Sequence, residues 1–164
     1  MNTVELFEEE VSKLPGKECW GVVGGVGSGS IISLSIGDKY PKAVASKNRH
    51  LSEIVRNNDS EFSLLIECPW RIESSAEVLC GSHHSNEKGG RYLSSFKQIT
   101  GIRIESIECN APAFDLKVLF SNGITLIANC CSIGVDENEC YSFGTPKGWF
   151  SVCFDGVVSL EPST

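Results

Sequence analysis

The chain has 164 residues and a net charge of −7, with 41% hydrophobic and 21% charged residues. That composition is typical of a soluble globular protein, and the length predicts a single domain over residues 1–164. The negative charge argues against nucleic acid as a partner, because phosphate binding needs a basic surface. No apolar run approaches the ~20 residues of a membrane-spanning helix, so we expect no membrane partner either.

The first residues predict a cytoplasmic protein. Residues 1–15 contain Glu5, Glu8, Glu9 and Glu10, whereas a secretory signal begins with basic residues. Thiols stay reduced in the cytoplasm, so the eight cysteines are expected to be structural and free.

The cysteine spacing does not indicate a metal site. The sequence has no Cys-x-x-Cys pair, and the adjacent residues Cys130 and Cys131 suit neither a zinc knuckle nor a simple disulfide. Several cysteines lie inside apolar strand patterns, where a free thiol behaves as a small hydrophobic group. We therefore expect no metal and no cofactor.

Residues 1–16 predict an N-terminal helix. Asn2 can cap its start, and Glu5 stands three residues later, as in a capping box. Pro15 and Gly16 end the pattern. Apolar residues recur at a spacing of three to four and make one stripe, formed by Val4, Phe7, Val11 and Leu14.

A glycine-rich stretch, 24–30, follows a short strand predicted over 19–23. A phosphate-binding loop opens a helix, whose N-terminus faces the anion. Here the next residues, 31–36, alternate between Ile or Leu and Ser, which predicts a strand. The stretch is therefore interpreted as a hairpin loop or bulge rather than a nucleotide loop.

The middle of the chain alternates between loops and short elements. Residues 37–60 are polar and predict a long loop with one or two helical turns. A strand over 61–73, broken at Pro69, and another over 76–80 follow. A second long loop, 81–90, precedes a short helix over 91–99.

Residues 114–130 carry the clearest structural signal. Two β-rich runs flank Asn122 and Gly123, which tolerate the positive φ of a tight hairpin turn. A strand over 102–110 precedes this hairpin, and a closing hairpin spans 140–155. The expected fold class is α+β: a mainly antiparallel sheet, arranged as a meander or sandwich, with an N-terminal helix and one or two short helices.

Histidines in the second long loop invite a metal or nucleophile interpretation. His83 and His84 follow Cys80 closely. Neighbouring residues of an extended chain point apart, so the two histidines cannot chelate one ion together. We interpret them as solvated loop residues.

Four motifs resemble those of a family of small bacterial proteins, over roughly residues 19–160. They are FSLLIECPWRI at 62–72, GIxIxxI at 101–107, the pair Asp115-Leu116 before NGIxL at 122–126, and GWxxV at 148–152. Members of that family, like many other β-rich proteins of this size, occur as immunity proteins beside secreted toxins. The motifs are fold-pattern residues, and the resemblance implies no catalytic residue.

The main hypothesis is therefore an immunity-type protein, not an enzyme, that neutralises a cognate cationic toxin, such as a nuclease. An acidic surface would be steered to such a partner. The predicted contacts are Asp136, Glu137 and Glu139 in one turn and Glu8, Glu9 and Glu10 on the first helix.

Two alternatives stay open. One is a small enzyme or ligand-binding domain that uses the glycine-rich loop or the His83-His84 loop. The other is an assembly subunit that adds an edge strand to a partner sheet. The oligomeric state is not predicted.

Overall fold

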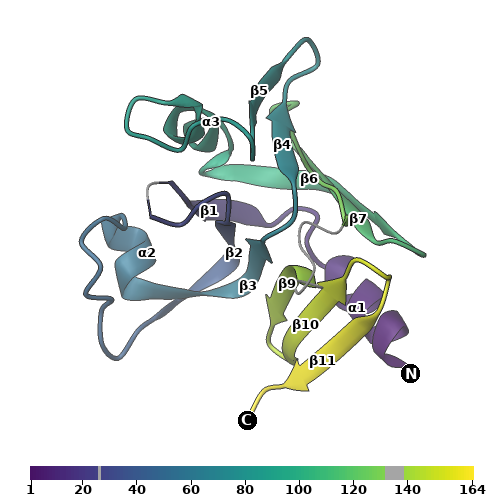
Figure 1. The fold of residues 1–164 in the computed structure, drawn as a ribbon. Helices are drawn as coiled ribbons and strands as arrows, with labels where there is room; N and C mark the ends of the chain where they lie inside the picture. The colour runs from purple at the N-terminus through teal and green to yellow at the C-terminus, as the bar shows by residue number, and fades with distance from the viewer. Residues whose placement is uncertain (26, 132–138) are drawn as a thin grey trace.

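A mostly antiparallel β structure with three short helices makes up the described part of the chain (Figure 1). The computed structural model describes residues 1–25, 27–131 and 139–164. The expected α+β class is confirmed. None of the helices within these residues is long and apolar enough to cross a membrane. In chain order the elements are α1 (Thr3–Val11), β1 (Glu18–Val23), β2 (Ile32–Pro41), α2 (Glu53–Asn57), β3 (Asn58–Ile66), β4 (Trp70–Glu73), β5 (Val78–Gly81), α3 (Arg91–Ile99), β6 (Ile102–Asn110), β7 (Asp115–Phe120), β8 (Thr125–Ala128), β9 (Glu139–Thr145), β10 (Gly148–Cys153) and β11 (Val158–Pro162).

The strands form one sheet in the order β11-β10-β9-β3-β2-β1-β6-β7-β8-β4-β5. Its middle is narrow, because β1 and β6 share only two residue pairs, Glu18 with Arg103 and Cys19 with Ile102. We call the strands from β11 to β1 half-sheet A and those from β6 to β5 half-sheet B. Buried residues of both halves belong to one apolar core.

The chain crosses twice between the two half-sheets. Residues 67–69 lead from β3 in half-sheet A to β4 in half-sheet B, and the chain returns from β8 to β9. Two backbone contacts tie these crossings together: the Asn129 N–H donates to the Pro69 carbonyl at 2.9 Å, and the Cys68 N–H donates to the Cys140 carbonyl at 2.9 Å. The predicted break at Pro69 is thus a crossing between half-sheets.

Helix α1 has the predicted cap and apolar stripe. The Glu5 N–H donates to Asn2 Oδ1 at 2.9 Å, and the Asn2 N–H donates to Glu5 Oε2 at 2.8 Å, which completes the capping box. Phe7 is fully buried and contacts the rings of Phe114, Phe143 and Phe150, with centroids 5.6–6.1 Å apart. These contacts dock α1 on both half-sheets.

The predicted central hairpin is β7–β8. Gly123 has a φ of +84°, and Asn122 Oδ1 accepts from the Ile124 N–H at 3.2 Å. Alternate residues on the two strands are buried, as the pattern predicts: Phe114, Leu116, Val118, Phe120, Ile124, Leu126 and Ala128.

The loop predicted over 37–60 is shorter in the structure. Strand β2 continues to Pro41, and β3 begins at Asn58, so only 42–57 leave the ladder. A bulge between Ile36 and Lys39, with Gly37 at a φ of +83°, shifts the side-chain alternation without ending the pairing. Because of this shift, the sequence pattern does not indicate that β2 continues beyond Ile36. The expected helical turn is α2.

Helix α3 covers the other end of the molecule, beside β5 and β1. Trp70 on β4 lies 5.1 Å from Tyr92 and 6.1 Å from Phe96, measured between ring centroids. The Trp70 indole N–H donates to the Ser30 carbonyl at 2.6 Å. Trp70 is therefore part of the core, and it also anchors the loop between β1 and β2.

Candidate functional site

The six predicted partner-binding acids have different environments. Asp136 and Glu137 lie outside the described residues. Glu139, at the start of β9, is half-buried, and its Oε1 accepts from Ser151 Oγ at 3.0 Å and also from Ser142 Oγ. The carboxylate of Glu139 is thus engaged inside the protein.

Glu9 and Glu10 on α1 are also engaged. Glu10 is buried, and its Oε1 lies 2.5 Å from Lys13 Nζ and 2.9 Å from Lys147 Nζ. Glu9 Oε1 lies 3.1 Å from Lys147 Nζ and 3.3 Å from Lys13 Nζ. Hydrogen bonds from Lys147 and Lys13 lower the pKa of Glu9, and the hydrogen bond to Glu10 raises the pKa of Lys147. These pairs tie α1 to the turn between β9 and β10.

Glu8, by contrast, is exposed and lines a shallow hollow of about 440 Å³ between α1 and β6. The hollow has an apolar wall from Val11, Pro15 and Ile107. Glu108 on β6 faces it as a second carboxylate, and none of the described residues that line it is a lysine or arginine.

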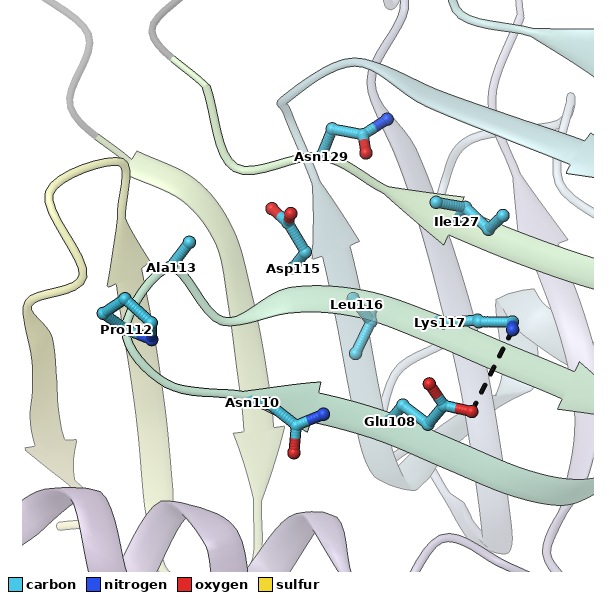
Figure 2. A pocket seen from close by; sticks show the side chains of 9 residues that line it. All are labelled: Glu108, Asn110, Pro112, Ala113, Asp115, Leu116, Lys117, Ile127 and Asn129. Carbon is cyan, nitrogen blue, oxygen red and sulfur yellow. Dashed lines mark ion pairs between the residues drawn. The ribbon is translucent and has the colours of Figure 1, made fainter.

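A second hollow of about 440 Å³ adjoins the first, because Glu108 and Asn110 line both. Figure 2 shows its residues on β6, on β7 and at the end of β8. Asp115 is exposed here, and its Oδ1 accepts from the Cys130 N–H at 2.6 Å. Lys117 is the one cation among the described lining residues, and its Nζ lies 4.0 Å from Glu108 Oε1.

We call the three exposed carboxylates of these hollows, Glu8, Glu108 and Asp115, the acidic strip. They come from α1, β6 and β7. The register pairs Glu108 with Lys117 and Asn110 with Asp115, which sets Glu108 and Asp115 along one hairpin. Only Glu8 of the strip belongs to the predicted set, because the sequence does not reveal that β6 and α1 are neighbours.

The glycine-rich loop meets the second long loop at a third hollow, of about 320 Å³. Asn86 Nδ2 donates to the carbonyls of Gly25 and Gly29 at 2.9 and 2.8 Å. The hollow is lined by Gly24, Gly25, His50, Asn86, Lys88 and Leu93. His83 and His84 are exposed and do not line it; His84 Nδ1 accepts from the Gly81 N–H at 2.9 Å.

Three cysteines converge where the two crossings between half-sheets meet. The Sγ atoms of Cys68, Cys130 and Cys140 all lie within 4.8 Å of one another, and all eight cysteines of the chain are free thiols. This is the one such group of potential metal ligands found in the described ranges 1–25, 27–131 and 139–164. No spacing in the sequence reveals it, because Cys68 and Cys130 lie 62 positions apart.

Comparisons of the chain with models of protein families, with curated proteins and with solved structures gave no match.

Some signals for these sites are present in the sequence in a weak form. Cys68 and Cys130 each follow the end of a strand by two residues, and Cys140 is the second residue of the strand to which the chain returns. Glu108 occupies an outward position of a strand whose pattern slips by one residue, at the bulge between Ile104 and Ser106. Neither feature points to a site without the topology that joins the elements.

Proposed function

We propose that this chain is an immunity-type protein that neutralises a cationic toxin domain, and that the acidic strip is its contact surface. One observation carries the proposal: the carboxylates of Glu8, Glu108 and Asp115 are exposed around two adjoining apolar hollows, with Lys117 as the one cation in the described lining.

Such a surface combines the two properties of a protein-binding site. Apolar area, here from Pro15, Ile107 and Ile127, supplies contact that excludes water, while charges at the rim steer the partner. A net charge of −7 extends that attraction beyond direct contact. A nuclease carries cationic side chains to hold phosphates, so an acidic inhibitor fits the same groove.

The test is co-expression with cationic toxin domains, beginning with any that is encoded beside this chain's gene. The wild-type chain should restore growth and co-purify with the toxin. A Glu8→Lys/Glu108→Lys chain should do neither, while Glu53→Lys/Glu77→Lys, which makes the same charge change at exposed positions elsewhere, should still protect. Toxicity that the wild-type chain does not relieve, without co-purification, would contradict the proposal.

The third hollow supports a second candidate, a small-molecule binding site. Asn86 holds the two loops together, and Lys88 and His50 place two basic side chains at the same hollow. Those groups favour an anionic ligand.

Thermal unfolding in the presence of nucleotides and divalent metals tests this candidate, since a ligand of the folded state raises the midpoint. Stabilisation should disappear in Lys88→Ala. It should persist in His83→Ala/His84→Ala, because those exposed histidines do not line the hollow. Equal loss in both variants, or no shift with any ligand, would count against it.

A further inference from the structure

We call the group formed by Cys68, Cys130 and Cys140 the thiol cluster. Their sulfur atoms lie within 4.8 Å of one another, although each cysteine comes from a different segment. Three thiolates around one ion at a metal–sulfur distance of about 2.3 Å sit roughly 3.8–4.0 Å apart. Rotation of the side chains by small amounts closes that difference.

The backbone around the thiol cluster is fixed by hydrogen bonds. The carbonyl of Cys140 accepts from the N–H groups of Glu67 and Cys68, both at 2.9 Å. The Cys130 N–H donates to Asp115 Oδ1 at 2.6 Å, and the adjacent Asn129 N–H donates to the Pro69 carbonyl at 2.9 Å. All three cysteines are thus held in place before any ligand binds, which lowers the cost of assembling a site.

The Phe114 carbonyl lies beside the cluster and accepts hydrogen bonds from three side chains. The Phe114 carbonyl accepts from Tyr141 Oη at 2.9 Å, from Cys130 Sγ at 3.5 Å and from Cys109 Sγ at 3.6 Å. Phe114 has a φ of +59°, unlike any other described residue except glycines. This uncommon backbone conformation places the Phe114 carbonyl where it accepts from Cys130 Sγ, and this hydrogen bond is lost when the thiol gives up its proton to bind an ion.

We propose that Cys68, Cys130 and Cys140 bind one thiophilic metal ion, Zn²⁺ or Cu⁺. Thiolate ligands select these ions over harder cations. The ion joins the segment after β3, the segment after β8 and the start of β9, and so it fastens the two crossings between half-sheets.

Charge and access are consistent with this role. Burial and the nearby Cys130 thiol together raise the pKa of Cys140 to about 12. A bound cation stabilises the thiolates, and binding releases their protons. Cys130 is the most exposed of the three cysteines, at 9%, whereas Cys68 and Cys140 are 0% and 1% exposed.

The two ions differ in the number of ligands they need. Cu⁺ is satisfied by three thiolates, whereas Zn²⁺ takes four ligands. No fourth Cys, His, Asp or Glu joins the group among the residues that the structure describes. Cys131, adjacent in sequence to Cys130, has an exposed free thiol and is the residue we test as a fourth ligand for Zn²⁺.

The experiment is an anaerobic titration of the fully reduced chain with Zn²⁺ and, separately, with Cu⁺, each against a chromophoric competing chelator. The wild type should take up one equivalent of at least one ion, with a rise in the thermal midpoint of about 5 °C or more at a hundredfold excess over Kd. Cys68→Ser, Cys130→Ser and Cys140→Ser should each lose stoichiometric uptake and the thermal shift.

The matched control is Cys80→Ser, which removes a buried thiol outside the cluster and should bind as the wild type does. Cys131→Ser separates the ions, since it should weaken Zn²⁺ uptake and leave Cu⁺ uptake unchanged. The proposal is overturned if the reduced wild type takes up neither ion stoichiometrically. It is also overturned if uptake survives all three cluster variants, because exposed thiols would then be the ligands.

Discussion

Two acidic regions of this protein lie next to each other and use their charge in opposite ways. At the corner between α1 and the β9–β10 turn, Glu9 and Glu10 face Lys13 and Lys147 at 2.5–3.3 Å. Along the acidic strip, the three side chains are exposed beside the two hollows, and their internal contacts are few: Asp115 accepts from the Cys130 N–H, and Glu108 lies 4.0 Å from Lys117. The charges of the corner are paired within the fold, whereas those of the strip are exposed, and we propose that a partner binds them.

Glu8 and Glu10 show how fine the division is. At about 3.6 residues per turn, these two residues flank the stripe of Phe7, Val11 and Leu14 on opposite sides and at similar angles. Glu10 meets Lys147 and is buried, while Glu8 faces the hollow beside β6 and is exposed. The tertiary neighbour therefore decides the role of each glutamate.

The largest expected effect on the corner comes from removing the ring of Phe7, which packs α1 against the two half-sheets. Phe7→Ala should lower the free energy of unfolding by about 3–5 kcal/mol, because it leaves a cavity among three aromatic rings. Urea denaturation measures the loss. Leu93→Ala, at a 52% exposed position on α3, is the control and should change stability by about 0.5 kcal/mol or less. Similar losses in the two variants would contradict the docking of α1 described above.

The comparison sharpens when the two glutamates are truncated separately. Glu10→Ala should cost about 2 kcal/mol, since it leaves two lysines without their shared buried carboxylate. Glu8→Ala should cost about 0.5 kcal/mol or less. Urea denaturation of both variants in the same buffer measures the two losses in the free energy of unfolding. Equal losses would contradict the distinction between corner and strip.

A third compensated acid, Glu61, adds a pH dependence. Burial alone raises the pKa of Glu61, but hydrogen bonds from Lys17 Nζ and the Asp38 N–H outweigh it and hold that pKa below 4.5. Its contribution is complete well above pH 4.5 and disappears as the pH falls through the lower folded-state value.

Glu61→Gln should therefore cost about 1–2 kcal/mol at pH 7 and progressively less below pH 4.5. Unfolding curves of wild type and variant between about pH 3 and 7 measure the difference, because this range includes the ordinary pKa of a carboxyl group. A difference that stays constant over this range would mean that the ionised carboxylate does not stabilise the fold.

The smallest expected effect is on the strip itself. Glu108→Lys should change the free energy of unfolding by about 0.5 kcal/mol or less, because its one ion pair, with Lys117 at 4.0 Å, is solvent-exposed. Thermal unfolding checks this value. A loss of more than about 1 kcal/mol would show that Glu108 supports the fold, contrary to its assignment to a binding surface.

Local structure in this chain follows largely from sequence periodicity, even in β6, where the alternation slips at the bulge between Ile104 and Ser106. Helix α3, strand β6 and the β7–β8 hairpin have the expected bounds to within a residue or two, because each has its own apolar repeat and turn residues. The end of β2 was hidden by the bulge after Ile36, where pairing continues although the alternation shifts.

The sites depend on long-range pairing, which a single sequence specifies poorly. The thiol cluster requires that two crossings between half-sheets lie side by side, and nothing near Cys68 in sequence indicates Cys130 as its neighbour. The acidic strip likewise requires α1 to lie along β6. The total charge and the absence of a helix after the glycine-rich loop, in contrast, were readable directly.

The most direct measurement of the central claim is the affinity of the purified chain for the proposed cationic toxin domain, determined by calorimetry at low and physiological salt. Glu8→Lys/Glu108→Lys should weaken binding by about 100-fold or more through like-charge contact, and Glu53→Lys/Glu77→Lys by about tenfold or less. Equal weakening by the two pairs would mean that only total charge matters, and unchanged binding in both would place the contact surface elsewhere.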